Sequence, residues 1–123
     1  MTPKKILVVE DSTDLADSLI DILKIKGFST TKTGSGYEAV DLATKELPDL
    51  ILLDLKLPDI DGYEVYRRLK SNQETANIKI LILTASDTFD GAPADLEIAS
   101  ENILHKPHWG ISELADRVET ELN

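Results

Sequence analysis

The stretch DLILLDLKLPDIDG, residues 49–62, decides the fold and is the point from which the rest of the chain can be interpreted. Residues 50–53 form an unbroken aliphatic run, a pattern typical of a strand buried on both faces of a parallel sheet. Asp54 follows directly, and a carboxylate at the carboxyl end of such a strand points into the crevice where open α/β sheets bind ligands. Pro58 and the pair Asp61-Gly62 then interrupt the chain before another helix. An aspartate that only ends a strand and begins a turn is the competing interpretation of Asp54.

Aliphatic runs alternate with helical repeats along the whole chain. The predicted strands are residues 5–9, 28–33, 50–53, 78–83 and 103–104. Helices are predicted after Ser12 or Thr13 up to Gly27, from the capping box at residues 35–38 through Leu47 to a stop at Pro48, over residues 62–70, and from residue 112 onward. This alternation implies parallel β-α units. The fold class predicted is α/β: a doubly wound five-stranded parallel sheet in the order 2-1-3-4-5, with helices on both faces, as in flavodoxin-like folds.

Composition limits the classes of function. The 123 residues predict a single domain, residues 1–123. A net charge of −10 argues against direct binding to nucleic acid or to an anionic membrane surface, both of which require excess Lys and Arg, but it is compatible with a divalent cation. The absence of Cys excludes disulfides and thiol chemistry. Because no targeting segment or long apolar run is visible, we expect a cytoplasmic domain.

Polar residues follow four of the five strands of the predicted sheet. They are Glu10, Asp11, Asp54, Thr84 and Lys106, and the carboxyl ends of parallel strands place them at one edge. Two carboxylates about 5 Å apart repel by roughly 3 kcal/mol at an effective dielectric near 20, a cost that a bound Mg²⁺ would offset. An ammonium and a hydroxyl suit a phosphoryl group as guest. Taken singly, each residue also fits a plain role at a helix start, a strand end or an exposed loop.

These residues, in this order, resemble a known family. The set is Glu10-Asp11, Asp54 with Leu57-Pro58 and Asp61-Gly62, Thr84-Ala85 and Lys106-Pro107. From about residue 4 to the C-terminus, the chain resembles the receiver domain of two-component response regulators, of the single-domain chemotaxis type. The resemblance implies that Asp54 is a phosphoacceptor. The implied donor is a sensor histidine kinase or a histidine phosphotransfer protein.

The resemblance also implies a role for each neighbour of Asp54. Mg²⁺, with Mn²⁺ as a substitute, would be bound by Asp11, Asp54 and the backbone carbonyl of Lys56, and by Glu10 directly or through a water. Lys106 would pair with one phosphoryl oxygen and Thr84 would swing to hydrogen-bond another. The small Ala85 would leave the site open and offer its backbone N–H. The physical requirements agree, because phosphoryl transfer depends mostly on positioning and on neutralising charge.

Several positions depart from the family pattern or remain open. Ile103 replaces the usual aromatic switch residue, so the usual coupling of Thr84 movement to an aromatic ring is in doubt. Gly91 and Pro93 weaken any helix before about residue 94. We expect an unusual output through the face around residues 87–109. Lys56 and Ser86, each two residues beyond a site residue, are candidates for tuning the lifetime of the phosphoryl group, and a Lys56 side chain that points to solvent is the alternative.

Two other functions compete with a phosphoacceptor domain that is not a conventional turnover enzyme. The first is a pseudo-receiver, an interaction module that is not phosphorylated. The second is a small Mg²⁺-dependent phosphatase with an aspartate nucleophile. Such an enzyme usually needs a second acid two residues beyond the first, and Lys56 occupies that position.

Overall fold

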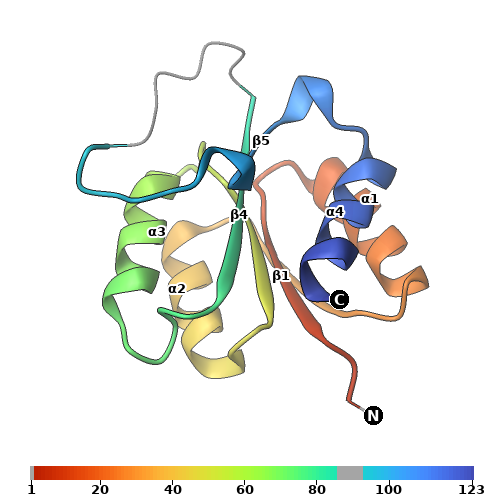
Figure 1. Cartoon of the computed structure of the whole chain (residues 1–123), viewed down its shortest axis with the longest axis horizontal. Helices are drawn as coiled ribbons and strands as arrows, with labels where there is room; N and C mark the ends of the chain where they lie inside the picture. The colour runs from red at the N-terminus through yellow and green to blue at the C-terminus, as the bar shows by residue number, and fades with distance from the viewer. Residues whose placement is uncertain (1, 86–92) are drawn as a thin grey trace.

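The computed structural model describes residues 2–85 and 93–123, which are built around one five-stranded parallel sheet (Figure 1). The strands lie in the order β2-β1-β3-β4-β5, which confirms the prediction. They are β1 (Lys5–Val9), β2 (Ser29–Thr33), β3 (Leu50–Asp54), β4 (Lys79–Thr84) and β5 (Ile103–His105). The helices are α1 (Thr13–Ile25), α2 (Gly36–Glu46), α3 (Gly62–Ser71) and α4 (Ile111–Leu122), with single 3₁₀ turns η1 (Ser100–Asn102) and η2 (Lys106–His108). Each predicted strand is present, and its ends are shifted by one residue at most.

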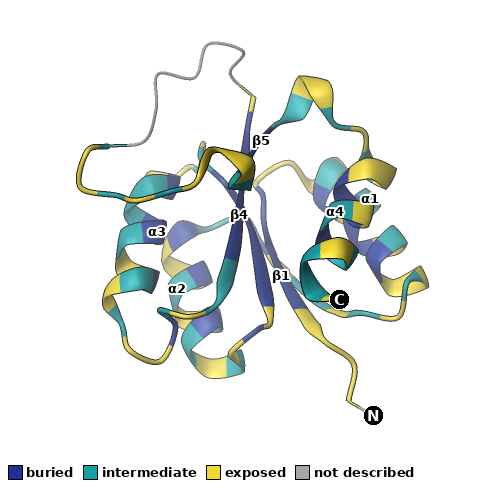
Figure 2. Cartoon of the chain, in the orientation of Figure 1, coloured by how far each residue is buried: buried dark blue, intermediate teal, exposed yellow. Residues whose placement is uncertain are grey.

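Two hydrophobic cores, one on each face of the sheet, hold the helices in place. Figure 1 shows α1 and α4 on one face and α2 and α3 on the other. Along β3, Leu50 and Leu52 pack in the core with α1 and α4, whereas Ile51 and Leu53 pack in the core with α2 and α3. Successive side chains of a strand point to opposite faces, so one aliphatic run supplies both cores. Accordingly, β3 is buried at every residue, and β1 and β4 are buried at all but their first residue (Figure 2).

Helices α1, α2 and α3 begin where short polar side chains cap them. Ser12 Oγ accepts a hydrogen bond from Leu15 N at 3.5 Å, Ser35 Oγ accepts one from Glu38 N at 3.1 Å, and Asp61 Oδ1 accepts one from Tyr63 N at 2.8 Å. These caps satisfy backbone donors that the first turn of a helix leaves unpaired. Within residues 2–85 and 93–123, no helix is long and apolar enough to cross a membrane.

The end of α2 differs from the prediction by one residue. The helix ends at Glu46, and Leu47 takes a left-handed conformation with a φ of 47° instead of continuing the helix. The physical reason is Pro48, whose ring disfavours the helical conformation in the residue before it. The Leu47 N–H still bonds to Ala43 O at 2.9 Å, so the last turn remains closed.

The chain between β4 and β5 contains no α-helix in its described part, residues 93–99. The predicted weakening of a helix by Gly91 and Pro93 concerns the residues before about 94, which lie almost entirely outside the described part of the chain. The segment is instead fastened to α3, because Arg67 Nε and Nη2 donate hydrogen bonds to the Asp95 carboxylate at 2.8 and 3.2 Å. Leu96 and Ile98 pack against the core beneath α2 and α3. Hydrophobic contact and one ion pair therefore hold this connection in place of helical structure.

Candidate functional site

Three carboxylates meet at the carboxyl edge of the sheet. Val9 and Leu53 are paired in neighbouring strands β1 and β3, so Glu10, Asp11 and Asp54 emerge side by side. Each of these three residues offers a carboxylate oxygen, and these oxygens lie within 4.8 Å of one another. Glu10 and Asp54 are both only 3% exposed, whereas Asp11 is exposed. Parallel pairing of two strands thus gathers acids that are more than forty residues apart in the chain.

Lys106, in the 3₁₀ turn that follows β5, supplies the positive charge. Its Nζ lies 2.7 Å from Glu10 Oε2 and 3.3 Å from Asp54 Oδ2, so one ammonium bridges two buried acids. Burial lowers the pKa of Lys106, but the carboxylates of Glu10 and Asp54 outweigh burial, and the pKa is raised overall. The ammonium therefore stays charged at neutral pH.

The raised pKa of Glu10 shows that its ionised form is disfavoured in this arrangement. Burial raises its pKa most, Lys106 opposes that shift, and the charge of Asp54 raises the pKa further, so that the net shift is upward. Oε1 accepts a hydrogen bond from Ser12 N at 3.1 Å. Among the described residues, Oε2 is buried without a donor in hydrogen-bond alignment, although Lys106 Nζ lies close to it.

Those observations fit a hard divalent cation. Such cations prefer oxygen ligands, and a second positive charge beside Lys106 would relieve the repulsion among the three acids. The buried Glu10 oxygen that lacks an aligned donor would gain a second partner besides the Lys106 ammonium, either the cation itself or one of its waters. The acidic cluster can therefore hold a metal ion.

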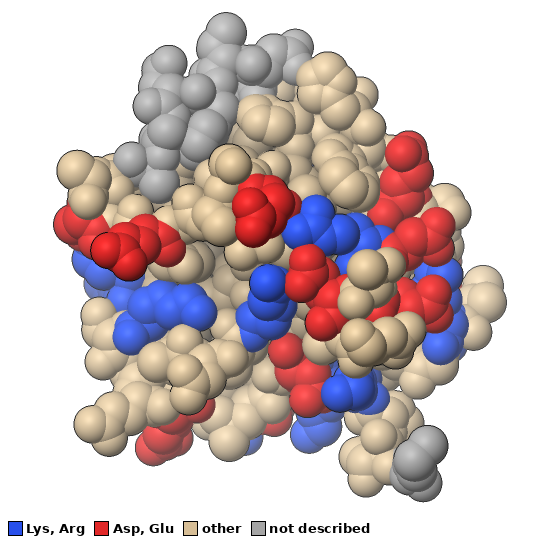
Figure 3. Space-filling view, in the orientation of Figure 1, with Lys and Arg blue, Asp and Glu red and all other residues tan. Residues whose placement is uncertain are grey.

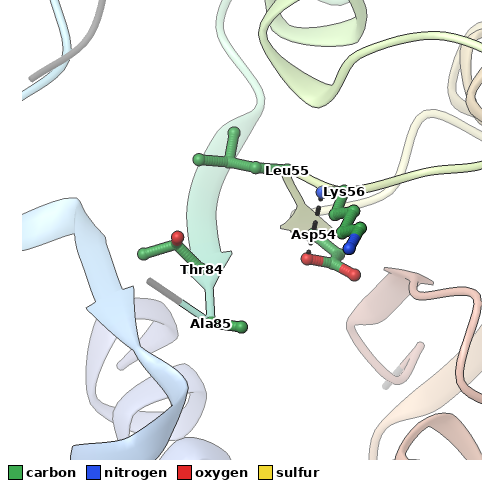
Figure 4. Close-up of a pocket in the computed structure, with 5 residues that line it drawn as sticks. All are labelled: Asp54, Leu55, Lys56, Thr84 and Ala85. Carbon is green, nitrogen blue, oxygen red and sulfur yellow. Dashed lines mark hydrogen bonds between the residues drawn. The ribbon is translucent and has the colours of Figure 1, made fainter. Parts of the chain in front are cut away.

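A pocket of about 350 Å³ opens beside Asp54. It is lined by Asp54, Leu55, Lys56, Thr84 and Ala85 (Figure 4). The Lys56 N–H donates to Asp54 Oδ1 at 3.3 Å, which orients the carboxylate. Figure 4 shows the Ala85 side chain on the side of Asp54, whereas the Thr84 hydroxyl is directed away from it. The pocket therefore offers space for a small group bonded to Asp54, and Thr84 would have to turn to reach that group.

The structure brings most of the predicted site residues together and leaves a few outside the site. Lys56 borders the pocket with an exposed side chain, so its influence on phosphoryl lifetime stays a prediction. Ser86 lies outside the described residues, as do residues 87–92 of the expected output face. Ile103 is 8% exposed and packs in the core with α2 and α3. Trp109 packs against the opposite core, the one beneath α1 and α4.

One residue near the site escaped prediction. Asp59, in the loop after β3, bonds to the start of α2 through Ser35, Gly36 and Tyr37. The capping signal at residues 35–38 is visible in the sequence, but it concerns only the residues of its own helix. A partner more than twenty residues away depends on how the two loops pack, and no local pattern shows it.

Comparisons with known proteins come from sequence and from structure. A family model for the response regulator receiver domain matches residues 6–119. Sporulation initiation phosphotransferase F of Bacillus subtilis (strain 168) is 36% identical over 118 residues, which are 96% of this chain and 93% of that protein. Response regulator MprA of Mycolicibacterium vanbaalenii is 36% identical over 116 residues, 94% of this chain but only 49% of that protein. The chain thus spans about half the length of MprA.

A solved structure adds a metal-bound neighbour. The Mn²⁺-bound form of response regulator Rcp1 is 30% identical and has a TM-score of 0.73, with coverage of 96% of this chain and 91% of that chain. The similarity therefore extends over nearly the whole length of both chains.

Proposed function

This chain belongs to the family of response regulator receiver domains, and we propose that Asp54 is the residue that accepts its phosphoryl group. The observation that carries the proposal is the place of the Asp54 carboxylate. It is 3% exposed at the end of β3, lies 3.3 Å from the ammonium of Lys106 and borders the pocket. A carboxylate that is buried, oriented and open to a small cavity is suited to act as a nucleophile.

In the proposed reaction, one Asp54 oxygen attacks the phosphorus of a phosphohistidine. The P–N bond breaks as the O–P bond forms, and the departing imidazole nitrogen takes up a proton from solvent. The product is an aspartyl phosphate, whose phosphorus is later attacked by water to release inorganic phosphate and restore the carboxylate. Each transfer thus stores one phosphoryl group on the chain, unlike the repeated turnover of a conventional enzyme.

The proposed metal is Mg²⁺, with Mn²⁺ as a substitute. Asp11, Asp54 and the backbone carbonyl of Lys56 would hold it, and Glu10 would contribute directly or through a water. When bound, the cation neutralises negative charge on the carboxylates and on the phosphoryl oxygens. The Mn²⁺-bound Rcp1 neighbour supports a divalent cation at such a site.

Three further residues would stabilise the phosphoryl group. Lys106 would exchange part of its contact with Asp54 for a contact with a phosphoryl oxygen. The N–H of Ala85 would donate to a second oxygen. The Thr84 hydroxyl would turn toward a third. The negative charge added by the phosphoryl group would in this way shift the equilibrium between two positions of Thr84.

The proposed upstream partners carry phosphohistidine: they are a sensor histidine kinase or a histidine phosphotransfer protein. The proposed downstream partner, a protein target or an effector domain, carries no phosphohistidine and is contacted through the face around residues 87–109. Direct nucleic-acid binding is not part of the proposal. On the face in Figure 3, the described Lys and Arg side chains are interspersed with acids, and Lys26 and Lys79 pair with Asp116 and Glu121 at 2.8 and 3.1 Å.

Intact-mass measurement tests the proposal. The protein is incubated with Mg²⁺ and either acetyl phosphate or phosphoramidate, which are small donors of phosphoryl groups. We expect the mass to increase by one phosphoryl group, and we expect no increase with the Asp54→Asn variant or in the presence of EDTA. A pseudo-receiver would show no adduct at all, and a phosphatase would release phosphate over many turnovers without one. Either result would refute the proposal.

A further inference from the structure

The Asp59 carboxylate fastens the loop after β3 to the first turn of α2. Oδ1 accepts a hydrogen bond from Gly36 N at 2.8 Å. Oδ2 accepts one from Ser35 Oγ at 2.7 Å and one from Tyr37 N at 3.1 Å. The hydroxyl of Ser35 and the two backbone N–H groups hold the pKa of Asp59 well below its usual range, so the carboxylate is ionised at neutral pH. Its negative charge also lies at the positive end of the helix dipole.

The turn that Asp59 holds touches both loops that supply the proposed metal ligands. On one side, a Cβ added to Gly34 would lie 3.3 Å from the Cα of Asp11, so the turn packs directly on the loop after β1. On the other side, a Cβ added to Gly36 would lie 2.5 Å from Cγ1 of Ile60, in the loop after β3. The turn before α2 is thus a spacer between the loop of Asp11 and the loop of Lys56.

The loop after β3 is also closed at its base. Gly62 N donates to Leu55 O at 2.9 Å. A Cβ on Gly62 would lie 2.5 Å from the Cα of Leu55, so the two backbones are in direct contact. Lys56, whose carbonyl is a proposed ligand, lies between this base and the Asp59 contact, and Pro58 adds a fixed φ between them. Without Asp59, the loop would keep the hydrogen bond at its base and the bond of the Lys56 N–H to Asp54, but it would lose its fastening to α2.

We propose that Asp59 is a positioning residue for the metal: by fastening its loop to the first turn of α2, it sets the separation between Asp11 and the carbonyl of Lys56. The inference rests on the proposed function, because it assumes that these groups bind Mg²⁺. Loss of the contact leaves the ligands present but poorly spaced. Changes to groups that support metal ligands typically weaken metal binding by about 10- to 100-fold. Because Asp59 acts through the loop and not on a ligand atom, we expect its loss to weaken metal binding by about 10-fold, near the lower end of this range.

The alternative role for Asp59 is helix capping alone, and a matched variant separates the two. Asp49 is also an exposed aspartate whose carboxylate joins two segments, since its Oδ2 accepts a hydrogen bond from Lys5 N at 2.7 Å. It lies at the amino end of the sheet, away from the acidic cluster. Asp49→Asn therefore removes the same charge and a comparable contact without touching the loops of the metal site.

The test is a Mg²⁺ titration of the whole chain, followed by the rise in melting temperature and by calorimetry. For Asp59→Asn we expect a Mg²⁺ dissociation constant about tenfold higher than that of the wild type. The phosphoryl adduct should still form when Mg²⁺ is saturating, because the substitution weakens Mg²⁺ binding and leaves phosphoryl transfer unchanged. Asp49→Asn should lower the melting temperature yet keep the wild-type Mg²⁺ affinity. Ser35→Ala, which removes one of the three donors, should shift the affinity in the same direction by less, and it decides the question if Asp59→Asn does not fold.

Failure of the inference can be told apart from failure of the proposed function. If the wild type binds Mg²⁺ but Asp59→Asn has the same affinity as Asp49→Asn, Asp59 only caps α2 and the inference is overturned. If the wild type shows neither Mg²⁺ binding nor a phosphoryl adduct, the proposed function fails and removes the basis of the inference as well.

Discussion

Replacing Lys106 by Met should destabilise the protein strongly in the absence of metal. The substitution keeps an unbranched side chain as far as Cε but leaves Glu10 and Asp54 without their shared ammonium. At an effective dielectric near 20, the attraction of Lys106 Nζ to Glu10 across 2.7 Å is about 6 kcal/mol, and to Asp54 across 3.3 Å about 5 kcal/mol. Carboxylate oxygens at the 4.8 Å limit repel one another by about 3.5 kcal/mol.

The net loss is smaller than these gross Coulomb energies, because burying the ammonium removes it from water. Removing one partner of a buried ion pair typically costs about 3–5 kcal/mol. The Lys106 side chain is 22% exposed, so we expect a loss near the lower limit, about 3 kcal/mol, or a decrease of roughly 10 °C in melting temperature. The penalty should be smaller in Mg²⁺ than in EDTA, because the cation replaces part of the missing charge.

The assay is urea unfolding of Lys106→Met in EDTA and in Mg²⁺. Lys79→Met is the matched control, because Lys79 makes a surface pair with Glu121 at 3.1 Å and its loss should cost less than about 1 kcal/mol. Adding Glu10→Gln to Lys106→Met removes one of the repelling charges and should recover much of the lost stability, with a coupling energy of about 2 kcal/mol. A Lys106→Met protein as stable as the wild type in EDTA would refute the electrostatic account of the site.

Three other changes test separate parts of the structure. Mg²⁺ should raise the melting temperature of the wild type, and Asp11→Asn should abolish most of that rise because a ligand charge is removed. Gly62→Ala should destabilise the fold by about 3 kcal/mol or more, measured by urea unfolding, since its Cβ would lie 2.5 Å from the backbone of Leu55. Arg67 lowers the pKa of Asp95, so the pair stabilises the folded state above the unfolded carboxyl pKa of about 3.9, and this contribution is lost as the pH falls through the lower folded pKa. The stability difference between wild type and Asp95→Asn should therefore shrink as the pH is lowered toward 3.

Each of these expectations has a contrary result. A melting temperature that does not respond to millimolar Mg²⁺ would argue against a metal at the acidic cluster. Wild-type stability of Gly62→Ala would mean that the backbone contact relaxes freely. A difference between wild type and Asp95→Asn that is constant from pH 7 to pH 3 would show that the ion pair with Arg67 contributes nothing to stability.

Much of the secondary structure could be predicted because its causes are local. The aliphatic run before Asp54 can be buried on both faces only in a covered sheet, and Ser12 and Ser35 cap the helices that follow them. The predicted end of α2, at Leu47, was one residue too late, and its cause is also local, because Pro48 acts on the residue before it. Propensity, periodicity and capping act within a few residues, so the sequence shows them directly.

The residues that make up the candidate site could be predicted from the sequence, but the distances between their atoms could not. The topology of parallel strands requires that their carboxyl ends share an edge, so Glu10, Asp11, Asp54 and Lys106 were expected together, and they lie together. Which oxygen Lys106 contacts, and which Glu10 oxygen lacks an aligned donor, depends on side-chain placement within tenths of an ångström. No periodic pattern encodes distances of that kind.

The sequence by itself determined the element order, the burial of β3 and the set of polar residues at one edge of the sheet. Only the tertiary structure decided that Asp59 holds the start of α2 and that Arg67 fastens Asp95 to α3. The physical reason is the separation along the chain of the residues that interact. Local preferences depend on neighbours three or four residues away, whereas these contacts join segments more than twenty residues apart and form only after the helices have packed on the sheet.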